Sequence, residues 1–579
     1  MYISAVVGSK ENINEWKEIL RIYISKNGYY HKFHTMKTTK SLNIYIGFCW
    51  FSSKEINQGE LIEEYDNKII YNCISLISNN NDFVFNKEKN EFSIKTPIAS
   101  PEEIMYINND NRFLVMSNDL RVLLNFSNRK LDSKGVYNLL KYGAFLPRTS
   151  LYKDIEKIPR GYESNFIVSD ENITKIVFHP RKPLKTYYSE EQNLENDFNN
   201  TISNSIKQLP DNPVLYFSGG VDSSYIAAMF KEVGRDDVIL FNYSFGDEDV
   251  EAAHAKDVAR ILDLPFMQEK FDERKILETI NSLGKDYSNP FGDGSVLPTN
   301  MLINSSLESL NNVGVIIDGV GADGLLGMHG KITQWSKIYK VPNLFRNTIS
   351  VLYKFLGVYN YPQDSFVEKI GRISRRSVQS PLSQASVMAQ NPLDNIMYDI
   401  PPEQNNEFNL EINKYLHSFA EDIVDKSGVI SLIDIMHTCA GEYASKTFSP
   451  LNSRGIRVFY PFLQDEIINL GLSSNIFNSE IESKSILKKY LENYLPKEFI
   501  YRKKSGFTPP YAKIFALSEI QAYFREVVLS EKNELTIFIN KIPILNALDL
   551  LNKNKTVSVG VYNFLWVLFF TTKWMNEQK

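Results

Sequence analysis

Polar and apolar residues alternate, or apolar residues form short runs, through roughly the first 177 positions of the chain. Residues 42–48 and 112–116 are clear examples, and both patterns are typical of β-strands. Residues 131–168 predict a helix, a loop at 146–150 and a strand pair that turns at Pro159-Arg160-Gly161. We therefore expect an N-terminal α+β domain with a sandwich-like arrangement.

The pattern changes in the second part of the chain. Apolar runs at 214–217, 238–245, 266–271 and 313–318 predict strands, and helical segments separate them. In the segment 249–262, Ala252, Ala255, Val258 and Ala259 share one helix face. Strands that alternate with helices indicate a mostly parallel sheet covered on both faces.

A polar, basic, proline-containing stretch at 179–192 separates these two patterns, so we predict domains at 1–185 and 194–579. Periodicity predicts mainly helices after about residue 331. The longest apolar run, 557–572, is interrupted by Gly560 and Asn563 and is too short to span a bilayer, so we expect a buried helix there and no membrane partner.

Composition narrows the function classes. A chain of 579 residues with 43% hydrophobic and 23% charged residues can form two sizeable cores. The net charge of −5 argues against a nucleic-acid partner. Three cysteines without a Cys-x-x-Cys pair suggest neither a disulfide framework nor a zinc site, and with no export signal we expect a cytoplasmic protein. His31 and His34 have helical spacing but no third ligand, so we expect surface or packing residues.

The strongest chemical signal is a glycine turn after an apolar strand, Ser218-Gly219-Gly220-Val221-Asp222-Ser223-Ser224. Glycines let the backbone approach a ligand, and N–H groups at the following helix start point toward anionic oxygens, so the turn predicts a phosphate-binding loop. It has neither the Lys-Ser/Thr of the Walker loop nor the Rossmann spacing. It resembles the loop of N-type ATP pyrophosphatases. That resemblance implies that Ser218, Gly219, Gly220, Asp222, Ser223 and Ser224 hold pyrophosphate and that Asp222 helps to bind Mg²⁺.

A second glycine-dense turn, Asp318-Gly319-Val320-Gly321-Ala322-Asp323, follows the strand predicted at 313–318. Both turns follow carboxyl ends of strands, so we expect them to meet at one crevice. Asp222 and Asp323 are the candidate Mg²⁺ ligands, since magnesium prefers carboxylate and phosphate oxygens. Gly319 and Gly321 are candidate nucleotide contacts. The alternative is a packing turn with a capping aspartate.

Further motifs occur in a fixed order at 290–299, 460–463, 495–498 and 501–504, and upstream at 118–121, 142–147 and 158–161. Together they resemble the asparagine synthetase B family, which includes β-lactam synthetases and lasso-peptide cyclases. The resemblance covers most of the chain except about 331–427. It implies a degenerate glutaminase-type, Ntn-hydrolase-like sandwich domain, followed by an N-type ATP pyrophosphatase (adenine nucleotide α-hydrolase-like) domain with a large helical C-terminal part.

In that family a substrate carboxylate attacks the α phosphate of ATP, which gives an acyl-adenylate and pyrophosphate, and an amine then displaces AMP. Lys504 matches the family's catalytic lysine, with Lys503 as the alternative, and a lysine there would stabilise negative charge in the transition state. Lys484 is a candidate for the pyrophosphate side. The alternative for each is a surface lysine.

The chain departs from the family pattern at two positions. Members that hydrolyse glutamine use a cysteine exposed by removal of the initiator methionine, whereas this chain has Tyr2. Val320 stands where asparagine synthetases carry a glutamate and β-lactam synthetases a tyrosine. Glu442 is the alternative acidic partner, unless it is an exposed helix glutamate.

We therefore expect an ATP- and Mg²⁺-dependent, AMP-forming ligase that joins a carboxylate to an amine from a source other than glutamine. Intramolecular cyclisation in natural-product biosynthesis is the specific hypothesis, with a small molecule or peptide as substrate and a biosynthetic partner protein as a further candidate. The alternatives are amidation of a small acid or sugar acid with free ammonia, and a catalytically inactive scaffold.

Overall fold

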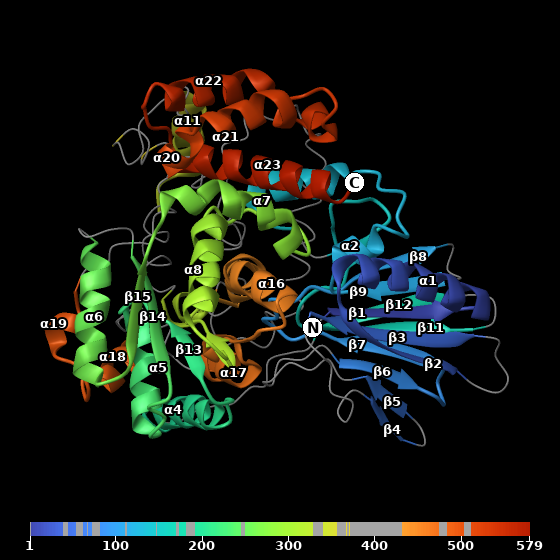
Figure 1. The fold of residues 1–579 in the computed structure, drawn as a ribbon, viewed down its shortest axis with the longest axis horizontal. Helices are drawn as coiled ribbons and strands as arrows, with labels where there is room; N and C mark the ends of the chain where they lie inside the picture. Colours follow the sequence, from blue (N-terminus) through green and yellow to red (C-terminus); the bar gives the residue numbers. More distant parts are fainter. Residues whose placement is uncertain are drawn as a thin grey trace.

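The computed structural model describes residues 2–38, 44–53, 62–65, 68–71, 82–109, 113–145, 148–169, 173–180, 191–244, 249–327, 340–355, 366, 370, 431–432, 434–473, 483–502 and 511–579. Two antiparallel sheets form the N-terminal part, and a parallel sheet with many helices forms the rest (Figure 1).

Each antiparallel sheet has six strands. The first has the order β10-β8-β9-β1-β3-β2, with β1 (Tyr2–Gly8), β2 (Tyr30–Lys37), β3 (Tyr45–Ser52), β8 (Met105–Asn109), β9 (Phe113–Ser117) and β10 (Glu156–Lys157). The second has the order β12-β11-β7-β6-β5-β4, with β4 (Ile62–Glu64), β5 (Lys68–Tyr71), β6 (Asp82–Asn86), β7 (Glu91–Lys95), β11 (Tyr162–Val168) and β12 (Ile173–Pro180).

Alternation along β1 explains how these sheets are covered. Ile3, Ala5 and Val7 belong to the core between the two sheets. Tyr2 and Val6 point to the other face and join the core that contains α1 (Lys10–Asn27), α2 (Leu120–Leu123) and α3 (Ser133–Tyr142). All seven β1 residues are buried, as expected for a strand covered on both faces. The sandwich-like α+β arrangement is thus confirmed for the described residues.

Two local predictions in this region were wrong. The strands on either side of Pro159-Arg160-Gly161 do not pair with each other: β10 pairs with β8 in one sheet, and β11 pairs with β7 and β12 in the other. The chain changes sheets at Gly161, where a φ of 71° turns the backbone. His31 and His34 lie on strand β2, so they do not lie on a helix as their spacing suggested.

Cys49 is buried in β3, and Cys73 lies outside the described residues.

The third sheet is parallel, with the order β15-β14-β13-β16-β17. Its strands are β13 (Pro213–Tyr216), β14 (Ile239–Ser244), β15 (Phe266–Lys270), β16 (Val315–Ile317) and β17 (Arg457–Phe459). The helices along this part of the chain are α4 (Glu191–Lys207), α5 (Val221–Glu232), α6 (Val250–Leu262), α7 (Ile276–Asp286), α8 (Val296–Ser309) and α9 (Ala322–Leu326).

Helices cover both faces of the parallel sheet, as the sequence predicted. Leu215 and Ile317 face the core shared with α4, α5 and α6, whereas Val214 and Ile316 face the core shared with α8 and α16 (Ser445–Ser453). In α6 the buried residues include the four predicted to share one face.

Helices also dominate the described C-terminal residues. They are α11 (Asn343–Phe355), the π-helix η3 (Asp434–Ala444), α16, α17 (Asp465–Ser473), α18 (Ser485–Leu491), α19 (Lys497–Ile500), α20 (Tyr511–Ala516), α21 (Ser518–Tyr523), α22 (Lys541–Asn552) and α23 (Val559–Glu577). Short 3₁₀ helices lie at Pro461–Leu463 and Glu534–Phe538, a short π-helix lies at Phe524–Val528, and a further 3₁₀ helix, Glu273–Lys275, precedes α7. The predicted buried helix at 557–572 is α23. Among the described helices, none is long and apolar enough to cross a membrane.

Candidate active site

Two glycine turns extend from neighbouring strands of the parallel sheet. β13 pairs directly with β16, and each strand is followed by one of the turns. A Cβ added to Gly319 would lie 3.6 Å from Cβ of Asp222, so the two turns are in contact. The structure therefore confirms that the turns at 218–224 and 318–323 meet at the carboxyl edge of the sheet, where ligands of such sheets bind.

The first turn is packed tightly against α6. Gly219 has a φ of +70°, and an added Cβ would lie 2.6 Å from Cα of Ala255. His254 Nε2 is 3.1 Å from the backbone oxygen of Gly219. A side chain at position 219 would be strained by its backbone conformation and would collide with α6, so glycine is required for two reasons.

The polar side chains of this turn differ in exposure. Ser218 is exposed, and the Gly220 N–H donates to Ser218 Oγ at 3.3 Å. Ser223 is buried and donates to the Gly220 backbone oxygen at 3.3 Å. Ser224 is also buried, and its hydroxyl has no hydrogen-bond partner in the described part of the chain.

Asp318 fixes the second turn to its surroundings. Thr447 Oγ1 donates to Asp318 Oδ2 at 2.8 Å, and the Val320 N–H donates to Asp318 Oδ1 at 3.2 Å. Burial raises the pKa of Asp318, although Thr447 opposes the shift. At Gly321, where φ is +112°, an added Cβ would lie 2.7 Å from Leu463 Cδ2, so the motif at 460–463 packs on this turn.

Lys484 connects the two predicted metal ligands. Its Nζ is 2.7 Å from Asp222 Oδ2 and 2.6 Å from Asp323 Oδ1. Burial lowers the pKa of Lys484, but the two carboxylates outweigh that effect and the net shift is upward. Two carboxylates within reach of one cation are the hard-oxygen donors that Mg²⁺ accepts when phosphate oxygens complete its shell. No group of three or more His, Cys, Asp or Glu side chains that could hold a metal ion occurs among the described residues.

Glu442 lies on the π-helix η3 and is buried, not exposed as the alternative interpretation required. Its Oε1 has no hydrogen-bond partner among the described residues. Burial raises the pKa of Glu442 well above its usual range, Asp293 and Asp434 add to the increase, and Lys446 opposes it. A buried carboxyl with an unused oxygen is suited to accept a proton or a hydrogen bond from an amine.

Glu442 also faces the N-terminal part of the chain. A Cβ on Gly143 would lie 3.1 Å from Glu442 Oε1 and 3.1 Å from Cα of Gly292, and the Gly292 N–H donates to the Gly143 oxygen at 2.5 Å. The motifs at 142–147 and 290–299 therefore meet beside this carboxyl group.

A buried ion cluster borders the same contact. Glu103 Oε1 is 2.9 Å from both Lys157 Nζ and Arg160 Nη2. Burial, with Arg160 and Lys157 acting in the same direction and Glu103 opposing them, lowers the pKa of His437, on η3, to about 3, so the imidazole is neutral at pH 7. A second ion pair lies near Glu442, where Lys446 Nζ is 2.9 Å from Asp293 Oδ2. Asp293 and Lys446 were not predicted as site residues, although Asp293 lies within the motif at 290–299 and Lys446 lies four residues after Glu442.

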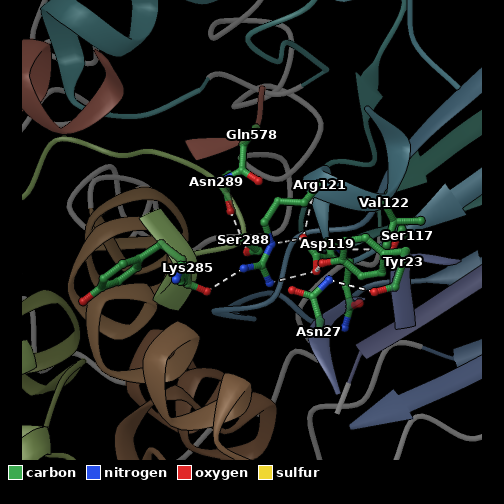
Figure 2. A network of polar contacts seen from close by, with 12 residues as sticks. Tyr23, Asn27, Ser117, Asp119, Arg121, Val122, Lys285, Ser288, Asn289 and Gln578 are labelled. Carbon is green, nitrogen blue, oxygen red and sulfur yellow. Dashed lines mark hydrogen bonds and ion pairs between the residues drawn. The ribbon is translucent and has the colours of Figure 1, made fainter. Parts of the chain in front are cut away.

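A second polar contact joins the two parts of the chain (Figure 2). Arg121 donates from Nε to Asp119 Oδ1 at 2.8 Å and from Nη2 to Asp119 Oδ2 at 2.9 Å. Its Nη1 donates to the Lys285 backbone oxygen at 2.5 Å, near the end of α7. The Arg121 guanidinium also lies 5.5 Å from the centre of the buried Tyr2 ring. Position 2 thus carries a packed aromatic side chain.

Lys503 and Lys504 lie outside the described residues, but the segment before them is held on α6. Arg502 Nη1 donates to Glu251 Oε1 at 3.0 Å, and the Phe499 ring stacks on His254 with centroids 5.3 Å apart. His254 contacts Gly219, so α6 touches both the first glycine turn and the segment that leads into 503–504.

The fold and site define an α/β protein with a parallel sheet covered by helices, preceded by an antiparallel sandwich, with acidic glycine turns at the carboxyl edge of the sheet. The family model described as asparagine synthase matches residues 207–568. The match spans more than half of the chain, which therefore belongs to the asparagine synthase family.

A solved structure of an NH3-dependent NAD synthetase from Campylobacter jejuni subsp. jejuni, in complex with the nitrate ion, is similar with 18% identity over 24% of this chain and 60% of that chain, at a TM-score of 0.18. The alignment thus spans less than two thirds of that synthetase, and a similarity at this score supports no argument about the fold. No curated protein matches the chain.

Proposed function

We propose that this protein is an ATP-dependent ligase that activates a substrate carboxylate as an acyl-adenylate and joins it to an amine. Membership of the asparagine synthase family supports this class of reaction. The observation that carries the proposal is the position of Asp222 and Asp323 at the carboxyl edge of the parallel sheet, where both carboxylates contact the ammonium group of Lys484.

In the first step a carboxylate oxygen of the substrate attacks the α phosphorus of ATP, and the bond to the β phosphate oxygen breaks, so pyrophosphate leaves. We assign the glycine turn of Ser218, Gly219 and Gly220 to the phosphates, since its backbone approaches a ligand without side-chain obstruction. Asp222 and Asp323 would hold Mg²⁺, which neutralises phosphate charge when bound. Lys504, or Lys503, remains our proposal for the group that stabilises the developing charge.

In the second step the amine nitrogen attacks the acyl carbon, the bond to AMP breaks, and the nitrogen loses a proton. We assign Glu442 to this step, because its unused Oε1 and raised pKa suit proton acceptance at a buried position. Val320, beside Asp318 on the second turn, offers no proton-accepting group.

The amine that we propose is not ammonia from glutamine. Position 2 is a tyrosine, whose side chain packs against Tyr29, Phe51 and Arg121 and has no thiol to act as the nucleophile. An Ntn-hydrolase-like domain without that chemistry would support the synthetase domain or help to bind substrate. An amine on the same substrate molecule would give a cyclic product, as in lasso-peptide or β-lactam biosynthesis.

The test is release of AMP and pyrophosphate from Mg·ATP with panels of acids and amines, including aspartate with ammonia and candidate precursor peptides. Asp222→Asn should abolish release, whereas Asp236→Asn, which alters an exposed partner of Lys231, should not. AMP formed only with one acid–amine pair would identify the substrates, and aspartate with ammonia would select the amidation alternative. Equal AMP release from wild type and Asp222→Asn would contradict the proposal.

A further inference from the structure

Lys484 stands between two carboxylates that come from different parts of the fold. Asp222 lies in the first turn of α5, Asp323 in the first turn of α9, and Lys484 immediately precedes α18. The Lys484 and Asp222 side chains are 11% and 15% exposed, so this pair is largely shielded, whereas Asp323 is 68% exposed. The bridge is thus open to solvent on the Asp323 side only.

The backbone holds Lys484 in this position. Its φ of 60° and ψ of 33° are left-handed, which is uncommon for lysine. Its N–H donates to the Leu326 oxygen at 2.9 Å, and the following Ile486 and Leu487 are buried. The ammonium group is therefore directed at the carboxylates by a fixed backbone, in contrast to a surface lysine that reaches a partner by chance.

The same two carboxylates are the oxygen donors that we assign to Mg²⁺. One ammonium group already contacts Asp222 Oδ2 and Asp323 Oδ1, so a metal ion held by these same two oxygens would have to displace it. Displacement without another anion nearby leaves a shielded positive charge unpaired, which is strongly unfavourable. Phosphate oxygens at the glycine turn would supply that anion, and both cations would then be paired.

We propose that Lys484 is a tethered counter-cation that keeps divalent metal off the Asp222–Asp323 pair until nucleotide phosphates arrive to accept its ammonium group. The inference rests on the proposed function of this site. It makes metal binding and nucleotide binding mutually dependent, and by linkage each ligand strengthens the other by the same factor. Lys484 is a positioning residue in the resting site as well as a candidate pyrophosphate contact.

The test measures Mn²⁺ binding by electron paramagnetic resonance of the free ion, with and without α,β-methylene-ATP. In the absence of nucleotide, Lys484→Met should bind Mn²⁺ at least about tenfold more tightly than wild type, within the range usual for coupled sites. The analogue should strengthen binding in wild type far more than in the variant. Adding Asp323→Asn to Lys484→Met should abolish the gain.

Lys489→Met is the matched control, because it removes a positive charge from α18, the helix that Lys484 precedes, where the half-exposed Lys489 pairs with Glu195. It should behave as wild type. Equal Mn²⁺ affinity of wild type and Lys484→Met without nucleotide would overturn the proposal, as would a gain that survives Asp323→Asn. Lys484→Gln serves if the methionine variant does not fold.

Wild type alone gives a check that needs no variant: Mn²⁺ affinity unchanged by the analogue also overturns the inference. Failure of the proposed function has a different signature, in which neither the analogue nor its Mn²⁺ complex binds at all. Binding of the complex without coupling to Lys484 would leave the ligase proposal intact.

Discussion

The Glu442 carboxyl group of the π-helix lies directly against Gly143 of the N-terminal part, with only 3.1 Å between Oε1 and the position of an added Cβ. Gly143 has a φ of +73° and ends α3. The N-terminal part of the chain thus contributes directly to the surroundings of the Glu442 carboxyl group.

Gly143→Ala should impair both stability and amide formation. The left-handed backbone alone costs alanine about 1–2 kcal/mol, and the methyl group would also press on Gly292 and Glu442. Gly28→Ala is the matched control, since Gly28 has a φ of +67° with nothing within 4 Å of its added Cβ. Thermal unfolding and AMP release measure the two effects, and equal losses in both variants would contradict the packing argument.

Glu442→Gln should stabilise the protein more at pH 8 than at pH 5. A carboxyl group with a raised folded-state pKa favours folding fully only below its unfolded pKa, near 4.5, and that contribution is lost as pH rises through the folded value. Glutamine does not titrate and removes this loss. Melting temperatures of wild type and variant across pH 5–8 measure this difference in stability. A difference that does not change with pH would refute the prediction.

The same substitution should separate the two half-reactions. If Glu442 acts on the amine, Glu442→Gln should retain ATP–pyrophosphate exchange driven by the acid but lose about 10²–10⁴-fold in amide formation. Parallel loss of both activities would instead assign Glu442 a structural or adenylation role.

Gly219→Ala should abolish adenylation. An alanine methyl group would lie 2.6 Å from Cα of Ala255, so the turn or α6 must shift. Gly234→Ala at the other end of α5 shares the positive φ, +71°, but meets nothing within 4 Å. It should cost about 1 kcal/mol of stability and leave AMP formation unchanged. Retained adenylation in Gly219→Ala would exclude the turn from phosphate binding.

Much of the parallel-sheet region could be predicted from sequence because its signals are local. Continuous apolar runs marked β13 to β16, and the face of α6 followed from helical spacing. The edge strand β17 was missed, since three residues with one exposed give no periodicity. The π-helix of Glu442 was expected only as a helical segment, because no periodicity in the sequence distinguishes i→i+5 from i→i+4 bonding over so short a stretch. Gly324 packs closely against Asp434 and Cys439 of this helix, a contact between distant segments that the sequence does not reveal.

The site itself was only partly predictable. The position of each glycine turn after a predicted strand was enough to place Asp222 and Asp323 at one edge of the sheet. Lys484 lies more than 150 residues beyond Asp323, and no local pattern reveals that its ammonium group contacts both carboxylates. The contact of Gly143 with Gly292 likewise joins two segments that are far apart in the sequence. Interactions between distant segments leave no periodic signal in the chain.

Glu251→Gln should slow adenylation without preventing nucleotide binding. The Glu251–Arg502 pair fixes the segment that leads into Lys503 and Lys504 on α6, so its loss should misplace the proposed catalytic lysine. Lys497→Met, at an exposed pair with Glu492 in the same region, is the control. Single-turnover AMP formation with saturating ATP measures the effect, and an unchanged rate would separate this ion pair from lysine placement.

One hydrophobic core contains Tyr2 and Val6 of the first strand, Leu283 of α7 and Phe570 and Trp574 of α23. During synthesis on the ribosome, apolar surface of the N-terminal sandwich therefore stays uncovered until hundreds of further residues, which include its packing partners, have been synthesised. A fragment that ends near residue 185 would expose this surface and should aggregate, whereas co-expression with the remaining residues as a second chain would allow the two pieces to assemble around it.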